Sequence, residues 1–260
     1  MHHQSTGSGP PLLLLHGFTG SMQNWEPLIP HLADSNTVIT VDLPGHGQSL
    51  SPANLEPYTM AVVASELINL MDRLGYSSFN LVGYSMGGRL ALFMAANHPD
   101  QVKKLILESA SPGLRTAAER QERIKSDHAL ADRIERGGIE SFVNFWESIS
   151  LWESQEQLPA LARDKLRQLR LLNSPAGLAN SLKGMGTGQQ PSLWPNLKDI
   201  NQDALLLTGQ LDIKFCAIME EMQSLMPKAK HHVIVKAGHT IHIEQPEAWL
   251  EAVLKFLTDS

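Results

Sequence analysis

The 260-residue sequence contains a single cysteine, Cys216, which excludes an intrachain disulfide and fits a reducing compartment. It also lacks a long hydrophobic run. The apolar stretch nearest the N-terminus, residues 12–15, is far shorter than the roughly 20 residues that a membrane-spanning helix needs. The N-terminal segment MHHQSTGSGP has no basic start followed by an apolar stretch, so we expect no signal peptide. These absences together predict a soluble, cytoplasmic protein.

Positive charge is scarce as well. The 21 Lys and Arg residues are outnumbered by 27 Asp and Glu residues, and the formal net charge is -6. The basic residues are scattered along the chain and form no cluster, which argues against a nucleic-acid partner and against a membrane-surface partner. With 42% hydrophobic and 18% charged residues, the chain can instead build a large core.

Short apolar runs alternate with longer amphipathic stretches near both ends of the chain. Strands are expected within residues 11–17, 36–47, 79–83, 103–109, 203–209 and 231–238, and helices within 57–75, 86–97, 216–226 and 247–257. This alternation predicts an α/β chain with a mostly parallel central sheet that helices cover on both faces.

Residues 112–200 interrupt this alternation, because they lack strong strand signals and are rich in Arg, Glu, Gln, Leu and Trp. We interpret them as a helical cap inserted between two halves of one core, residues 1–111 and 201–260. The alternative is an ordinary set of surface helices.

Residues 83–87 read Gly-Tyr-Ser-Met-Gly and link an expected strand directly to an expected helix. Small flanking residues let a serine occupy a tight strand-to-helix turn, which exposes its hydroxyl at the positive end of the helix. This context predicts an α/β-hydrolase fold with Ser85 as a catalytic residue. About ten residues precede the strand at 11–17, so one or two edge strands common in this fold are expected to be short or absent.

A catalytic serine needs a base, and the base needs a carboxylate that orients it. In this fold the chain order is serine, then acid, then histidine. Asp212 follows the expected strand 203–209 and His239 follows the expected strand 231–238. Both positions lie at the carboxyl ends of strands, where ligand clefts form. The sequence therefore predicts a catalytic triad of Ser85, His239 and Asp212.

An oxyanion hole in this fold uses two backbone N–H groups. One belongs to the residue after the serine, Met86. The other lies in the loop after an early strand, where HGFTG occupies residues 16–20, and we expect Phe18 to supply it. The remaining histidines show no spacing that would bring three or four metal ligands together, so we expect no metal and no cofactor.

Arg89 lies one helical turn after Ser85, so both side chains can face the same side. The expected cap contributes further arginines, among them Arg115, Arg120, Arg123, Arg163, Arg167 and Arg170. If two of these face the cleft beside Arg89, an acidic protein has a basic pocket. Arginine pairs with carboxylates through two parallel hydrogen bonds, so such a pocket favours a polycarboxylate substrate. For each of these arginines, the alternative is a solvent-exposed position on a helix surface.

From about residue 12 onward the chain resembles the 2-succinyl-6-hydroxy-2,4-cyclohexadiene-1-carboxylate (SHCHC) synthases of menaquinone (vitamin K2) biosynthesis. The motifs HGFTGS and GYSMGGRLA are shared with that family and are common to many α/β hydrolases. More specific are LESASPGLRTAAERQERI (107–124), FVNFWESI (142–149), GLANSLKGMGTGQQPSLW (177–194), GQLDIKF (209–215) and KAGHTIHIEQP (236–246).

The resemblance implies a carbon–oxygen lyase that eliminates pyruvate from 2-succinyl-5-enolpyruvyl-6-hydroxy-3-cyclohexene-1-carboxylate, a tricarboxylate. It implies that Arg89, Arg123 and Arg170 are cationic anchors for this substrate, and that Tyr84 and Trp146 are further pocket residues. In the implied mechanism His239, oriented by Asp212, polarises Ser85, whose oxygen removes a ring proton. No covalent intermediate is required, although the same residues would also serve a nucleophilic serine.

Two other functions stay open at this point. A serine hydrolase, either an esterase or a carbon–carbon bond hydrolase acting on a carboxylate-bearing substrate, would use the same triad without needing the three arginines. A non-catalytic binding module on the same fold would have no reason to keep the triad and both oxyanion positions. Alanine substitution of the three arginines separates the lyase from the hydrolase, because it should abolish pyruvate elimination and need not harm the hydrolysis of small neutral esters. The oligomeric state is left open by the sequence.

Overall fold

The computed structural model describes residues 1–259, and within them seven strands form one sheet in the order β1-β3-β2-β4-β5-β6-β7. The strands are β1 (His3–Thr6), β2 (Pro11–Leu15), β3 (Thr37–Val41), β4 (Phe79–Tyr84), β5 (Val102–Glu108), β6 (Asp203–Gly209) and β7 (Ala229–Ile234). Only the pairing of β1 with β3 is antiparallel among these residues. The predicted fold class, a mostly parallel α/β sheet, is confirmed.

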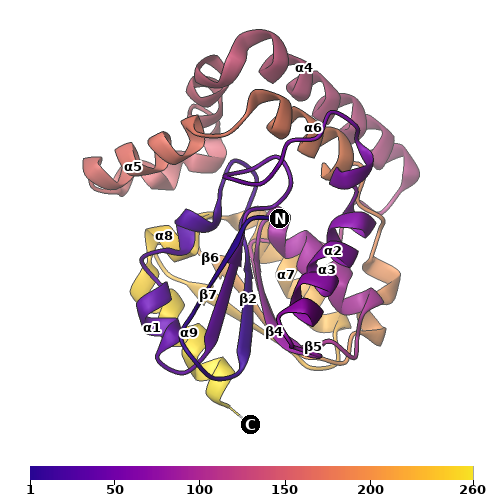
Figure 1. Cartoon of the computed structure of the whole chain (residues 1–260), viewed down its shortest axis with the longest axis vertical. Helices are drawn as coiled ribbons and strands as arrows, with labels where there is room; N and C mark the ends of the chain where they lie inside the picture. Colours follow the sequence, from indigo (N-terminus) through magenta and orange to yellow (C-terminus); the bar gives the residue numbers. More distant parts are fainter. Residues whose placement is uncertain (260) are drawn as a thin grey trace.

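Helices cover both faces of the sheet (Figure 1). One face carries α2 (Met60–Arg73), α3 (Met86–Asn97) and α7 (Ile213–Leu225), and the other carries α1 (Ile29–Ala33), α8 (Ile241–Glu244) and α9 (Pro246–Thr258). Short 3-10 turns, η1 (Met22–Trp25) and η2 (Glu56–Tyr58), lie in the loops before α1 and α2. The two helical layers explain why the central strands are apolar throughout.

Strand β2 shows this two-sided burial most clearly. Leu13 and Leu15 pack into the cluster beneath α2 and α3, whereas Leu12 and Leu14 pack into the opposite cluster. Successive side chains of a strand point to opposite faces, so a strand covered on both faces reads as one continuous apolar run. The sequence PLLLLHG is such a run.

The two edges of the sheet differ from this pattern. The polar segment His3–Thr6 forms β1, a four-residue edge strand, which fits the expectation of a shortened edge. At the other edge β7 ends at Ile234, earlier than the expected strand 231–238, and Val233 and Val235 are exposed. An edge strand has a neighbour on one side only, so its apolar residues are covered less completely.

Between β5 and β6 the chain forms only helices within the described residues: α4 (Ala117–Glu147), η3 (Ser150–Gln157), α5 (Ala160–Leu171), α6 (Pro175–Met185) and η4 (Trp194–Asp199). Figure 1 shows α4, α5 and α6 together at one end of the sheet. Helix α4 breaks at Gly138, whose φ of 72° is non-helical, and α4 and α6 share a separate hydrophobic cluster. None of the helices in residues 1–259 is long and apolar enough to cross a membrane.

Candidate active site

Ser85 lies on the turn between β4 and α3 with a φ of 50°, a left-handed conformation that is strained for a residue with a side chain. The turn is tightly packed. A Cβ atom at Gly83 would overlap the carbonyl oxygen of Gly87, and one at Gly87 would overlap that of Leu15. The two glycines of the motif are therefore required sterically, because α3 must start directly against the ends of β2 and β4.

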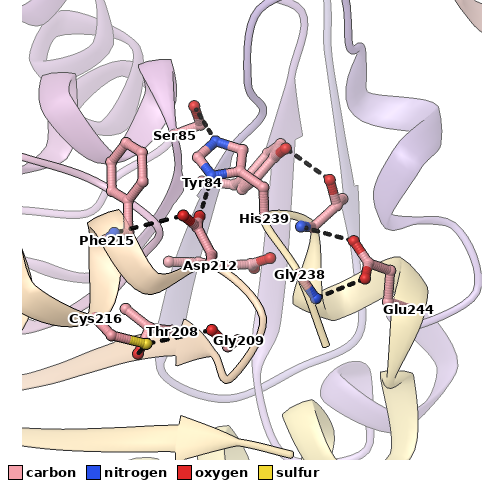
Figure 2. A network of polar contacts seen from close by, with 12 residues as sticks. Tyr84, Ser85, Thr208, Gly209, Asp212, Phe215, Cys216, Gly238, His239 and Glu244 are labelled. Atoms are coloured by element: carbon pink, nitrogen blue, oxygen red, sulfur yellow. Dashed lines mark hydrogen bonds and ion pairs between the residues drawn. The ribbon is translucent and has the colours of Figure 1, made fainter. Parts of the chain in front are cut away.

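The structure brings the three predicted triad residues into one hydrogen-bonded chain (Figure 2). The Nε2 atom of His239 lies 3.0 Å from the Ser85 hydroxyl, and its Nδ1 atom lies 2.6 Å from Oδ2 of Asp212. With the ring proton on Nδ1, the imidazole donates to Asp212 and accepts from Ser85. This geometry can transfer a proton from the serine to the histidine.

The backbone on both sides of His239 is fixed by one side chain. The carboxylate of Glu244 accepts hydrogen bonds from the N–H groups of Gly238 and Thr240, at 2.6 and 3.1 Å (Figure 2). Asp212 is held as well, because its Oδ1 atom accepts from the N–H of Phe215, and the Phe215 ring packs against His239. The imidazole is therefore positioned before any ligand binds.

The two predicted oxyanion donors come from different elements. Met86 is the first residue of α3, and Phe18 lies in the loop after β2. Among residues 1–259 neither backbone N–H donates a hydrogen bond to the protein. Both residues line the cleft that contains Ser85. Two unused N–H groups beside the serine are the arrangement that stabilises a developing oxyanion.

The loop that carries Phe18 is supported by two buried histidines. The Nδ1 atom of His16 donates to the Gly17 carbonyl at 2.8 Å, and its Nε2 atom accepts from the N–H of Leu43 at 3.0 Å. This pairing requires neutral His16. Burial lowers the pKa of His16 to about 4, and burial together with the nearby His16 lowers the pKa of His46 to about 3.

These two histidines predict a loss of stability in mild acid. Both stay neutral in the folded protein, while the unfolded chain takes up their protons below about pH 6.5. Their stabilisation is therefore complete above that pH and is lost as the pH falls towards 4. At pH 5 the free energy of unfolding should be lower by about 2 kcal/mol for each histidine than at pH 7.5. Urea denaturation at the two pH values measures this difference.

The control for that measurement is His46→Gln, which removes one of the two buried imidazoles. Its unfolding free energy should depend less steeply on pH, whereas His232→Gln, at an exposed position, should leave the slope unchanged. An equal slope in all three proteins would contradict the assignment of the acid sensitivity to this loop.

The cleft above the triad has a volume of about 290 Å³ and contains both Arg89 and Arg123. Arg89 is 9% exposed, and its guanidinium donates to the Met185 carbonyl and to the Gln190 side chain, at 3.1 and 3.4 Å. No carboxylate in residues 1–259 forms an ion pair with it. Burial and the positive charge of Arg123 lower the pKa of Arg89 to about 10. The group is therefore still a cation at neutral pH, and only neutral acceptors contact it.

The other two predicted anchors are paired with carboxylates. Arg123, whose side chain is partly exposed, forms a 2.7 Å ion pair with the buried Asp127, and both residues line the cleft. Arg170 is buried, and it contacts Glu147 at 2.9 Å and Gln155 at 3.1 Å. It lines an adjoining pocket rather than the cleft that contains Ser85. Arg89 and Arg123 thus line the cleft that contains Ser85, whereas Arg170 lines the adjoining pocket.

Tyr84 and Trp146, the two further predicted pocket residues, both line the Ser85 cleft. The Tyr84 hydroxyl bonds to Oγ1 of Thr240 at 2.8 Å, and burial raises its pKa. Tyr84 therefore stays neutral. The indole N–H of Trp146 is buried and has no hydrogen-bond partner in residues 1–259.

Sequence reasoning missed several residues around the triad. Trp152 lies edge-on to the His239 ring at 5.8 Å and lines the cleft. Glu108 is fully buried; its carbonyl accepts from the N–H of Ser85, and its carboxylate binds the side chains of His242 and Trp249. Glu108 ends a parallel strand beside Ser85, which was an available signal. Trp152 lies in the helical insertion, where no pattern in the sequence marks it.

Both the sequence and the structure of this chain are similar to those of known proteins. A family model described as the alpha/beta hydrolase fold matches residues 10–246. A protein of Bacillus subtilis (strain 168), named provisionally as an SHCHC synthase, is 46% identical over 95% of this chain and 90% of its own length. The SHCHC synthase of Enterobacter sp. (strain 638) is 34% identical over 92% of this chain and 88% of its own length. The structure of MenH from S. aureus has a TM-score of 0.95 and 38% identity, and covers 99% of this chain and 98% of that one.

Proposed function

The chain belongs to the SHCHC synthase family of the alpha/beta hydrolase fold, and from this premise we propose how its residues carry out the reaction. The protein is a carbon–oxygen lyase of menaquinone biosynthesis. It eliminates pyruvate from 2-succinyl-5-enolpyruvyl-6-hydroxy-3-cyclohexene-1-carboxylate and leaves SHCHC. The predicted resemblance and the predicted enzyme class are confirmed.

We propose that the triad acts as the base of this elimination. Product and substrate differ by the loss of one ring hydrogen and of the enolpyruvyl ether. The Ser85 oxygen removes the proton from the ring carbon that carries the succinyl group, as its own proton passes to Nε2 of His239. The C–H electrons shift the ring double bond, and the C–O bond of the ether breaks. The enolpyruvate anion that leaves takes up one proton at its methylene carbon and becomes pyruvate. The protonated His239 releases one proton in exchange, so the triad returns to its starting state and no net proton is gained or lost.

The removed proton is adjacent to the ketone of the succinyl group, so negative charge develops on the ketone oxygen during proton removal. We propose that the backbone N–H groups of Phe18 and Met86 bind this oxygen. Donors that are already oriented in a site shielded from water stabilise such charge without reorganisation. Neither N–H group has a hydrogen-bond partner in residues 1–259, which supports this assignment.

The observation that carries the substrate assignment is the buried cation of Arg89 in the cleft of Ser85, which forms no ion pair with a carboxylate of residues 1–259. A buried arginine without a carboxylate partner is costly unless a ligand supplies the negative charge. We propose that Arg89 and Arg123 bind substrate carboxylates directly. Arg170 is the third proposed anchor, and it acts from the adjoining pocket beside Tyr84 and Trp152.

We also propose that residues 112–200 act as a cap over a core of residues 1–111 and 201–260. The cap has its own hydrophobic cluster, and it contributes Arg123, Trp146 and Trp152 to the cleft while the core contributes Ser85 and His239. The proposed partner is the small tricarboxylate substrate, with no nucleic acid or membrane. The proposed location of the protein is the cytoplasm, because its single cysteine fits a reducing compartment.

The triad alone would also suit a serine hydrolase, because the same hydrogen bonds would activate Ser85 as a nucleophile. A coupled assay separates the two. Purified protein is mixed with the enolpyruvyl cyclohexene carboxylate, and lactate dehydrogenase reports the pyruvate released, beside p-nitrophenyl acetate as a neutral ester. Rapid pyruvate release that is lost in Arg123→Ala supports the lyase. Ester hydrolysis without pyruvate release supports the hydrolase.

A further inference from the structure

Ser109 has a buried hydroxyl that the folded protein does not use. The residue is 0% exposed, and its Oγ atom has no hydrogen-bond partner in residues 1–259. It directly follows β5. Because Glu108 is the register partner of Tyr84 in the parallel ladder, Ser109 lies beside Ser85 at the ends of adjacent strands. Both serines line the same cleft.

The backbone at Ser109 is also strained, with a φ of 47°. Its N–H donates to the carbonyl of Leu207 at 3.0 Å, so the main chain is held firmly in this conformation. Four non-glycine residues in 1–259 have a φ in this region: Thr19, Ser85, Ser109 and Lys236. Each follows the carboxyl end of a parallel strand, the end of the sheet at which the triad lies. Strained backbone of this kind gathers at sites that bind or react.

A buried hydroxyl without a partner and a strained backbone both reduce the stability of the folded protein. No side-chain hydrogen bond within residues 1–259 offsets the cost of burying the hydroxyl. Two other buried donors without a protein partner, the indole N–H groups of Trp146 and Trp152, also belong to residues of this cleft. Residues that line the cleft thus carry unused hydrogen-bond donors, one from the core and two from the helical insertion.

We propose that the Ser109 hydroxyl donates a hydrogen bond to a carboxylate oxygen of the bound substrate and so forms a substrate-binding position with Arg89. Both residues line the cleft of Ser85. The Gln190 side chain accepts from Arg89 at 3.4 Å and donates at 3.1 Å to the carbonyl of Ser111, two residues after Ser109, so Arg89 is tied to the loop that carries Ser109. A cation and a neutral donor that converge on one cleft suit an anionic oxygen. The inference rests on the proposed function and extends it to a residue outside the triad, the oxyanion hole and the arginines.

The test is Ser109→Ala, measured by pyruvate release and by titration of the cleft tryptophans' fluorescence with the product SHCHC. Loss of a hydrogen bond to a charged group should raise KM and the product Kd about tenfold or more. The kcat should change much less, because the bond is made equally in the ground state and the transition state. The melting temperature should stay equal or rise, since no protein hydrogen bond is lost.

Ser21→Ala is the matched control, because Ser21 is also buried with an unpartnered hydroxyl but does not line the cleft. It should leave KM unchanged. Ser109→Gly is a second variant that relieves the strained φ; it should weaken binding like the alanine variant and fold readily.

An unchanged KM and Kd in both Ser109 variants, with normal pyruvate release by the wild type, would overturn this inference alone. A joint fall of kcat and melting temperature at unchanged KM would show a structural role and would overturn it too. If the wild type releases no pyruvate at all, the proposed function fails, and the substrate-binding role of Ser109 fails with it.

Discussion

Ser85→Ala is expected to slow pyruvate release by about 10²–10⁴-fold, the usual contribution of a positioned general base. The hydroxyl is the group that His239 contacts at 3.0 Å, and the alanine side chain offers no atom to accept the ring proton. The KM should change little, because the arginines of the cleft are untouched. Steady-state kinetics with the coupled pyruvate assay measures both constants.

The effect of Ser85→Ala should not add to that of removing its partner. His239→Ala should cost a similar factor, and the double variant should be little worse than either single one, because the residues act as one unit. Asn97→Ala, in the last turn of the same helix and facing solvent, is the control and should behave like the wild type. A Ser85→Ala variant that keeps more than a tenth of the activity would rule out Ser85 as the base.

Arg89→Ala is expected to lower kcat/KM by about 10²–10³-fold, mainly through KM, since the loss of one partner of a buried charge pair costs about 2–5 kcal/mol. We expect this large effect at Arg89 because its guanidinium forms no ion pair with a carboxylate in residues 1–259. Substrate would supply that partner. Product titration by tryptophan fluorescence, beside the kinetic assay, shows the loss of binding directly.

Two further variants extend this test: the first shows whether charge or geometry matters at position 89, and the second compares Arg89 with Arg170. Arg89→Lys keeps the charge but lacks the planar two-pronged donor, so it should recover part of the lost affinity. Arg170→Ala should raise KM less than Arg89→Ala, because Arg170 is held by Glu147 and Gln155 in the adjoining pocket. A larger effect at Arg170 would contradict this ranking of the two cations.

The sheet and the positions of the triad residues could be predicted from the sequence because both depend on local patterns. Continuous apolar runs such as residues 11–15 are typical of strands covered on both faces. Ser85, Asp212 and His239 each follow such a run, and parallel strands place their carboxyl ends along one edge of a sheet. The three residues therefore meet even though they are far apart in the chain.

The partners of the arginines could be predicted in this way only in part. Arg123 and Asp127 lie one helical turn apart in α4, so helical spacing alone can pair them. Arg170 and Glu147 lie on different helices, and only the packing of the helical insertion brings them together. Ser109 was missed for a related reason. A hydroxyl is unpartnered only relative to everything packed around it, and no local pattern reports that.

A single-turnover reaction tests most directly whether Ser85 and His239 act as a base in pyruvate elimination. Protein in excess over the enolpyruvyl cyclohexene carboxylate is quenched over time, and the pyruvate formed and the intact mass of the protein are measured in the same samples. If the two residues act as a base, one pyruvate forms for each substrate while the protein mass stays unchanged throughout. A transient mass increase located on Ser85, or consumption of substrate without pyruvate, would contradict this role.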